Sequence, residues 1–248
     1  MNWPYYIAIL SAITLSIPLI LILLLRLYTN KSFLALGIYY LLAFVYNLMT
    51  SGILSASVPW RRNFAITNNF LDVPLLLIFL LYFTRSWRLS KQLLTGIGTY
   101  IIFEIITVII TGFNITATTI ILGPGILIIL SFCFFFFLKH IQVHHDHAQE
   151  PGKIVMLSTL LFSYGSYSLI YVFHYVLKMP YIDDVFLVYY LVTTIASIAM
   201  ATGVWMERKL ITQSEVEAIT AQPRKTKSVE ANGYAKVIPL DENEFRYK

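Results

Sequence analysis

Seven apolar segments follow one another along this chain, and each is long enough to cross a lipid bilayer as a helix. A membrane-spanning helix needs about 17 to 25 mostly apolar residues. Inside a bilayer the backbone polar groups must be satisfied within the protein, which a helix achieves by itself. We therefore predict an all-α, polytopic membrane protein whose residues 1–206 form a seven transmembrane helix bundle, with spans at 3–28, 32–54, 64–87, 93–113, 115–138, 154–177 and 185–206.

The composition supports the membrane class. Hydrophobic residues make up 58 % of the chain, charged residues 12 %, and the mean hydropathy is +0.71, far from the values of a soluble domain. The single cysteine, Cys133, leaves no intrachain disulfide to be formed. The net charge of +5 is spread over short flanks and the tail rather than gathered in one patch, so we expect a lipid bilayer and no nucleic acid as partner.

Lysine and arginine near the helix ends predict the orientation, because cytoplasmic ends carry an excess of these residues. One side of the predicted bundle has nine of them: Arg26, Lys31, Arg85, Arg88, Lys91, Lys139, Lys153, Arg208 and Lys209. The other side has three: Arg61, Arg62 and Lys178. We therefore expect the N-terminus outside and the C-terminus in the cytoplasm of a cell membrane protein.

After Met206 the sequence becomes charged and mixed, and residues 207–248 are predicted to form a cytoplasmic tail, helical at first and then disordered. Such a tail is too short for an effector domain. A sensor built in this way would need a separate cytoplasmic signalling partner.

The third span carries the polar residues that are hardest to place in a membrane. Asn68 and Asn69 precede Asp72 by four and three residues, so a helix puts both amides near the carboxyl group. A carboxylate costs about 2.5 to 3.5 kcal/mol on insertion into the centre of a bilayer. We therefore expect Asp72 to face the interior of the bundle and to find a partner there.

Asp72 lies at a predicted depth in the membrane similar to that of polar residues on other spans. With a rise of about 1.5 Å per residue, Asp72 and Glu104 each lie about 12 Å below the predicted outer surface. Four further residues lie about 6 to 11 Å below it on spans two, six and seven. We predict a ligand-binding pocket in the outer half of the bundle, formed by Asp72, Glu104, His174, Asn47, Asn68, Tyr171 and Tyr190.

Hydroxyl side chains recur every three or four residues on span six, at Tyr164, Tyr167, Ser168 and Tyr171. Such a stripe belongs on a face that meets other helices, since facing lipid would leave its hydrogen bonds unmade. Two interpretations stay open: the stripe lines the pocket, or it only joins helices.

The connection between spans five and six is rich in histidine. His140 and His144 are four residues apart, which on a helix would suit one transition metal, whereas a short histidine-rich loop is also typical of a solvated connector. The spacing HExxH is absent, and we assign no metal site to the sequence.

The segment DVPLLLIFLLYF, which begins at Asp72, looks like the third-helix pattern of microbial rhodopsins, in which a polar residue precedes PLLL. The seventh helix of that family carries the lysine that binds retinal. No lysine lies between Asp184 and Met206 here, so a covalent retinal pigment is not expected and the family is not assigned.

The sequence contains no phosphate loop, no GxGxxG and no GxSxG. We expect a protein that binds a small ligand, an ion or an apolar cofactor, as a sensor or a proton-coupled transporter, and the cofactor stays unidentified. The alternative is an intramembrane enzyme for a lipid or another apolar substrate, with Asp72, Glu104 and His174 as its acid–base set.

Overall fold

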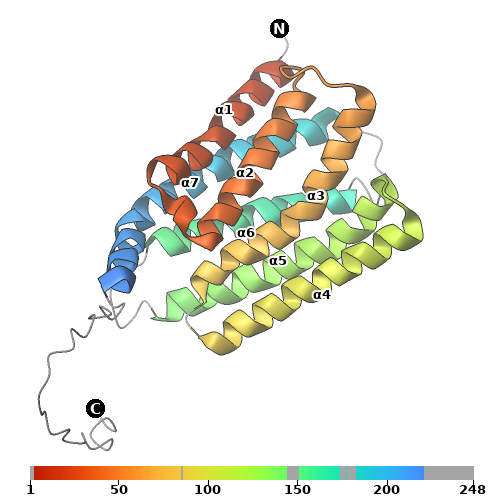
Figure 1. Ribbon diagram of the computed structural model, residues 1–248. Coiled ribbons are helices and arrows are strands. Elements are labelled where there is room, and N and C mark those ends of the chain that lie inside the picture. The colour runs from red at the N-terminus through yellow and green to blue at the C-terminus, as the bar shows by residue number, and fades with distance from the viewer. Residues whose placement is uncertain (1–2, 85, 144–150, 174–176, 178–182, 221–248) are drawn as a thin grey trace, which may run out of the picture. The chain divides into compact units, whose positions relative to one another are not determined.

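The computed structural model describes residues 3–84, 86–143, 151–173, 177 and 183–220. The chain divides into two units, Met1–Thr212 and Gln213–Lys248. Of the second unit the structure describes residues 213–220, which are helical. The helices of the first unit form the bundle that holds the candidate site (Figure 1).

The regular structure of the described residues is entirely helical. Seven helices contain a segment long and apolar enough to cross a membrane, which confirms the predicted all-α fold with seven spans. Two short 3-10 turns, η1 (Leu27–Thr29) and η2 (Leu81–Phe83), follow the first and third helices. The helices are α1 (Trp3–Leu24), α2 (Lys31–Thr50), α3 (Val58–Leu80), α4 (Trp87–Thr111), α5 (Ile115–Val143), α6 (Pro151–Tyr171) and α7 (Asp183–Thr220).

The ends of α3 and α7 differ from the sequence-based boundaries. Helix α3 begins at Val58 rather than at Phe64, because Pro59 suits the first turn of a helix, where no backbone N–H is needed. Between Val58 and Asp72 the helix rises about 21 Å, so the carboxyl group lies well inside the bundle. Helix α7 continues through the end of the predicted span at Met206.

Polar side chains close the tight turns between helices. The Asn30 side chain accepts a hydrogen bond from the Ser32 N–H at the start of α2, and Ser86 accepts one from the Leu89 N–H at the start of α4. Gly112, with φ 83, ends α4 in a conformation that favours glycine. These caps satisfy backbone groups that would otherwise lack partners at the helix ends.

Helix α3 lies at the centre of the contacts that position the site. It packs against α2, α4 and α5, while α5 packs against α6 and α1 against α2 (Figure 1). Helix α7 is joined to α6 by a hydrogen bond between Tyr167 and Thr193. Side chains from five helices can therefore meet beside the middle of α3.

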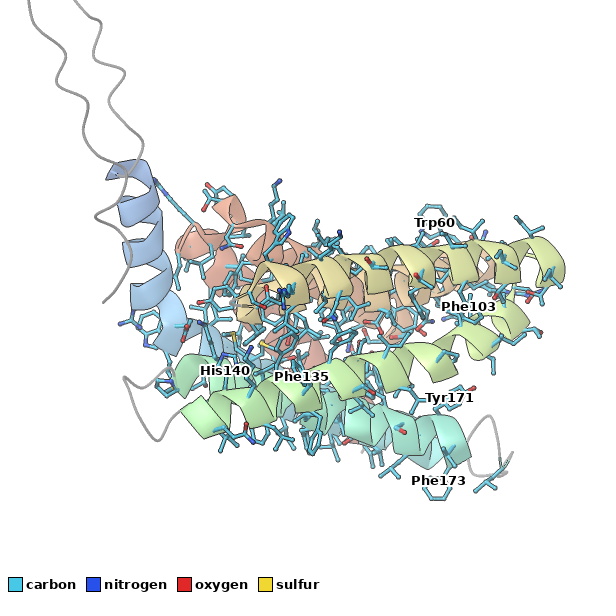
Figure 2. All side chains as sticks on the ribbon, turned by 90° about the horizontal axis from the view of Figure 1, so that it is seen from below. Trp60, Phe103, Phe135, His140, Tyr171 and Phe173 are labelled. Carbon is cyan, nitrogen blue, oxygen red and sulfur yellow. The ribbon has the colours of Figure 1, made fainter. Side chains whose placement is uncertain are left out.

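Large apolar side chains fill the half of the bundle in which α3 ends and α2 begins. The Phe33 and Phe79 rings pack edge to face at 5.7 Å, and the Phe83 ring lies 6.4 Å from that of Phe136. All four side chains are buried. Figure 2 shows His140 toward this end and Tyr171 toward the end at which α1 and α3 begin, here called the N-terminal end.

Candidate functional site

A cavity of about 200 Å³ lies beside the middle of α3, and we name it the Asp72 cavity. Helices α2, α3, α5, α6 and α7 all contribute to its wall. The lining residues are Tyr39, Ala43, Asn68, Asn69, Asp72, Leu122, Ile126, Tyr164, Tyr167, Ile170, Tyr171 and Tyr189.

The carboxyl group of Asp72 is held by one tyrosine. The Tyr164 hydroxyl on α6 donates a hydrogen bond of 2.7 Å to Asp72 Oδ1 on α3. Tyr164 is 1 % exposed, so packing fixes the position of its hydroxyl. Within the described part of the chain, no hydrogen bond reaches Asp72 Oδ2. The acid thus keeps one oxygen available beside the cavity.

Tyrosine rings form much of the cavity wall. The Tyr167 ring stacks on that of Tyr189 at 5.6 Å and meets that of Tyr164 edge to face at 5.7 Å. The Tyr167 hydroxyl lies 3.1 Å from the Thr193 hydroxyl, within hydrogen-bonding distance. Because neighbouring rings and hydroxyls hold one another, these side chains form a fixed aromatic surface.

The sequence GPG in α5 makes room for another tyrosine of the wall. The Tyr171 hydroxyl donates a hydrogen bond of 3.1 Å to the Thr119 carbonyl. A Cβ atom on Gly123 would lie 2.8 Å from that hydroxyl, closer than side chains tolerate. Glycine at this position therefore lets the phenol of α6 pack directly against the backbone of α5.

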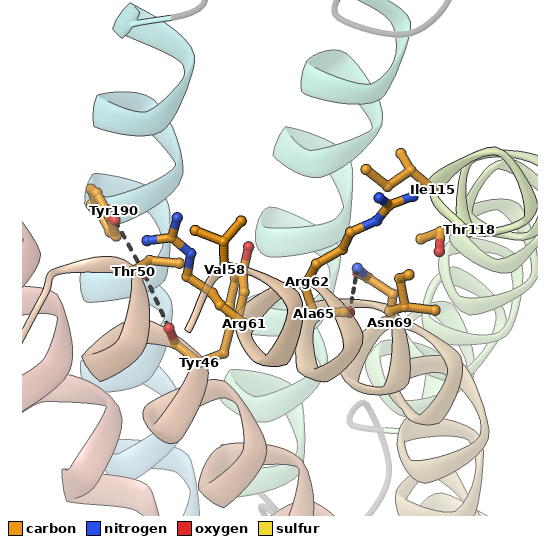
Figure 3. A pocket seen from close by; sticks show the side chains of 11 residues that line it. Tyr46, Thr50, Val58, Arg61, Arg62, Ala65, Asn69, Ile115, Thr118 and Tyr190 are labelled. Carbon is orange, nitrogen blue, oxygen red and sulfur yellow. Dashed lines mark hydrogen bonds between the residues drawn. The ribbon is translucent and has the colours of Figure 1, made fainter. Parts of the chain in front are cut away.

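A second and larger hollow of about 600 Å³ lies at the N-terminal end, and we name it the arginine hollow (Figure 3). Arg61 extends from α3 toward Tyr190, and Arg62 extends toward Thr118. Asn69 lines both this hollow and the Asp72 cavity, so the two spaces adjoin. The full lining is Tyr46, Thr50, Val58, Arg61, Arg62, Ala65, Ile66, Asn69, Ile115, Thr118 and Tyr190.

The residues of the predicted pocket lie in different parts of the structure. Asp72, Asn68 and Tyr171 line the Asp72 cavity. Tyr190 lines the arginine hollow, and its hydroxyl lies 3.5 Å from that of Thr50.

Neither Asn47 nor Glu104 is among the residues that line the two hollows. Asn47 is 2 % exposed and donates a hydrogen bond of 3.1 Å to the Ser11 hydroxyl, which joins α2 to α1. Glu104 is 6 % exposed, and its Oε1 has no hydrogen-bond partner among the described residues. His174 lies outside the described residues, and its role stays a prediction. Of the alternative acid–base set, Asp72 is thus the member seen to line the cavity.

Four tyrosines of the cavity were not among the predicted site residues. Tyr164 and Tyr167 belong to the hydroxyl stripe of span six, whereas Tyr39 and Tyr189 were not singled out at all. Each of the latter two is followed by another tyrosine, Tyr40 or Tyr190. Adjacent helical residues point about 100° apart, and the sequence does not say which of the two faces the cavity. The density of tyrosine on α2, α6 and α7 was the signal that could have found them.

A second buried acid lies at the opposite end of the bundle. Glu207, which the predicted boundaries put at the start of the tail, is 0 % exposed. Its Oε1 accepts a hydrogen bond of 2.9 Å from the Tyr82 hydroxyl and lies 3.8 Å from Lys153 Nζ. The same ammonium lies 5.0 Å from the centre of the Tyr82 ring. This acid has an internal basic partner.

The histidine-rich connection contributes one described side chain. His140 is buried, and its Nδ1 lies 2.9 Å from the Phe136 carbonyl oxygen. His144 to His147 lie outside the described residues. Among the described residues, no group of three or more His, Cys, Asp or Glu side chains could hold a metal ion.

Comparison with known proteins adds no family to this description. No family model, curated protein or solved structure matches the chain. The fold and the composition define an integral membrane protein with seven candidate spans.

Proposed function

We propose that this membrane protein binds a small polar molecule in the Asp72 cavity, as a receptor or a transporter. The observation that carries the proposal is a carboxyl group inside the bundle, held through one oxygen by Tyr164, beside an open volume of about 200 Å³. Acidic side chains are costly within a membrane and commonly mark substrate or ion pathways. Binding sites typically combine apolar and aromatic walls with a few placed polar groups, as here.

The size of the cavity favours a small molecule over an extended apolar cofactor. Pockets for drug-sized ligands measure about 300 to 1,000 Å³. The Asp72 cavity is smaller, at about 200 Å³, and its wall carries Asn68 and Asn69 in addition to the acid. A compact ligand with at least one polar group suits this space.

Access to the cavity is proposed to run through the arginine hollow. Asn69 lines both spaces, and the hollow lies at the N-terminal end of the bundle. With the N-terminus outside, as the lysine and arginine bias favours, the ligand would enter from outside the cell.

The orientation has its own test. A single cysteine is introduced at position 147 (H147C) after removal of the native thiol (C133A). With the proposed orientation, an impermeant thiol reagent added to intact cells leaves this cysteine unlabelled, while permeabilised cells become labelled. Labelling of intact cells would reverse the assignment of inside and outside.

Ligand binding is tested with the full chain in lipid nanodiscs and a library of small water-soluble metabolites, read out by thermal unfolding. At least one compound is expected to stabilise the wild type. The same compound should not stabilise A43F, because the larger side chain at Ala43 fills part of the cavity. A library without a stabilising compound, or equal stabilisation of A43F, contradicts the proposal. Uptake of that compound into proteoliposomes separates a transporter from a receptor.

A further inference from the structure

The described wall of the Asp72 cavity has an acidic side chain and no basic one. Asp72 contributes a carboxyl group, and none of the described residues that line the cavity is a lysine, arginine or histidine. A carboxylate in surroundings of low dielectric constant is stabilised by a nearby positive charge. The described wall supplies no such charge, so a ligand can supply it.

The aromatic wall suits the same kind of ligand. Five tyrosines line the cavity, and the hydroxyls of three of them, Tyr164, Tyr167 and Tyr171, are already engaged by protein groups. The rings of all five belong to residues of the cavity wall, where those of Tyr167 and Tyr189 stack on each other. Cations are attracted to the faces of aromatic rings, and quaternary ammonium groups are commonly bound by several rings together.

At the opposite end of the bundle, a tyrosine and an acid are accompanied by a lysine. There a tyrosine hydroxyl donates to an acid, as Tyr82 does to Glu207, and the Lys153 ammonium lies near both the carboxylate and the ring. In the Asp72 cavity, Tyr164 and Asp72 repeat the tyrosine–acid pair without a lysine. An open volume of about 200 Å³ lies beside that pair.

We infer that the ligand of the Asp72 cavity is a small organic cation with an alkylammonium group. This inference rests on the proposed function and specifies its ligand class. The ammonium group binds beside the carboxylate of Asp72 and against the tyrosine rings, and the alkyl part contacts the apolar side chains Leu122 and Ile126. A cation with an N–H group can also donate to Asp72 Oδ2, whereas a quaternary cation uses charge and the rings alone.

The test uses two quaternary cations, tetramethylammonium and choline, one primary cation, ethanolammonium, and one neutral compound. The neutral compound is dimethylbutanol, the carbon isostere of choline, in which a tert-butyl group replaces the trimethylammonium group. Isothermal titration calorimetry of the full chain in nanodiscs measures each affinity. At least one cation should bind, and choline should bind at least about tenfold more tightly than its isostere.

Variants of the cavity residues test whether the preference for a cation arises in the Asp72 cavity. D72N should weaken cation binding at least about tenfold and leave the binding of the neutral isostere unchanged. Y164F should weaken cation binding less, since it removes a hydroxyl that orients the acid. Y82F removes the matching hydroxyl of the Glu207 pair and serves as the control with unchanged cation affinity. A thermal unfolding curve for each variant verifies that it is folded.

The outcomes separate this inference from the proposed function. Equal affinity for choline and its isostere overturns the inference that the ligand is a cation. If A43F then abolishes the binding of both compounds, the proposed binding cavity is still supported. Binding of no cation in the panel also overturns the inference. In that case the metabolite library decides the proposed function independently. Cation binding that survives D72N and A43F unchanged places the cation elsewhere and refutes the inference.

Discussion

Two acid–tyrosine pairs lie at different levels of this bundle, and their surroundings differ in one component. Tyr82 donates to Glu207 at 2.9 Å, and Tyr164 donates to Asp72 at 2.7 Å. The first pair has the Lys153 ammonium 3.8 Å from the acid. The second has a cavity of about 200 Å³. A basic side chain thus accompanies the first pair, and an open volume accompanies the second.

The two sites differ in their internal cation: Glu207 has one, and the described wall of the Asp72 cavity does not. Removal of one partner from a buried ion pair leaves an uncompensated charge, so Glu207 is tied to the stability of the fold. Asp72 has no basic partner in the described wall of its cavity, and the fold does not depend on such a pair there. Four experiments test this contrast between the two acids.

The largest expected effect is on folding and follows from E207A. This change leaves the Lys153 ammonium, whose side chain is 13 % exposed, without the carboxylate of Glu207. The free energy of unfolding should fall by about 3 kcal/mol, measured by denaturant titration in detergent micelles. The exposed Thr202 of the same helix gives the control T202A, with a loss below about 0.5 kcal/mol. A similar small loss in E207A would mean that the ion pair is dispensable.

The second experiment supplies the missing ammonium within the chain. N68K places a lysine in the cavity wall one helical turn before Asp72, where it can pair with the acid. The affinity for choline should fall at least about tenfold, because the new ammonium competes with the ligand. N68M has a side chain of similar length without charge and should lower the affinity less. Equal losses in the two variants would assign the effect to lost space instead of charge.

The third experiment concerns the arginine hollow, whose positive charge should slow the approach of a cation. The double variant R61Q/R62Q should raise the association rate of choline by about two- to fivefold at low ionic strength. The gain should shrink as salt is added, since the Debye length falls to about 8 Å at physiological ionic strength. Stopped-flow tyrosine fluorescence measures the rate. An association rate that is equal in wild type and variant and does not depend on salt would exclude this hollow as the access path.

The smallest expected effect is that of D72N on stability. An amide has the size of a carboxyl group and its oxygen can accept the Tyr164 hydrogen bond, so the free energy of unfolding should stay within about 1 kcal/mol of the wild type. The measurement is the denaturant titration used for E207A. L76N, one turn further along α3, replaces a fully buried leucine and should cost several kilocalories, about 3 or more. A loss in D72N as large as that in L76N would make Asp72 a structural acid.

Much of the fold could be predicted because the length of an apolar segment is a direct physical requirement of the membrane. The seven spans follow from it. The start of α3 was harder to predict from the sequence, because Arg61 and Arg62 are typical of a loop. In the structure they belong to the first turns of the helix. The burial of Glu207 could not be predicted for a similar reason. The composition changes from apolar to charged at this residue, which is typical of the start of a cytoplasmic tail.

Part of the lining of the candidate cavity could be predicted, because the depth of a residue follows from counting along a helix, whereas the direction of its side chain does not. Depth indicated Asp72 and Tyr171, helical spacing added Asn68, and all three line one cavity. Glu104 was grouped with them by depth, but the residues that line the cavity do not include it. Which face of α4 turns toward α3 depends on the rotation and tilt of packed helices. Those angles are set by side-chain packing across the whole bundle, which no single segment encodes.

Gly152 and Gly203 bring α6 and α7 into close contact. A Cβ atom on Gly152 would lie 2.8 Å from the Gly203 carbonyl oxygen, and one on Gly203 would lie 2.6 Å from Met156 Cγ, so the two helices touch almost backbone to backbone. Near the cavity, by contrast, α7 meets α6 through the hydroxyls of Tyr167 and Thr193, 3.1 Å apart. A crowded contact resists sliding, whereas a hydroxyl pair can exchange partners. Helix α7 is thus packed almost backbone to backbone against α6 near Glu207, and through side-chain hydroxyls beside the Asp72 cavity.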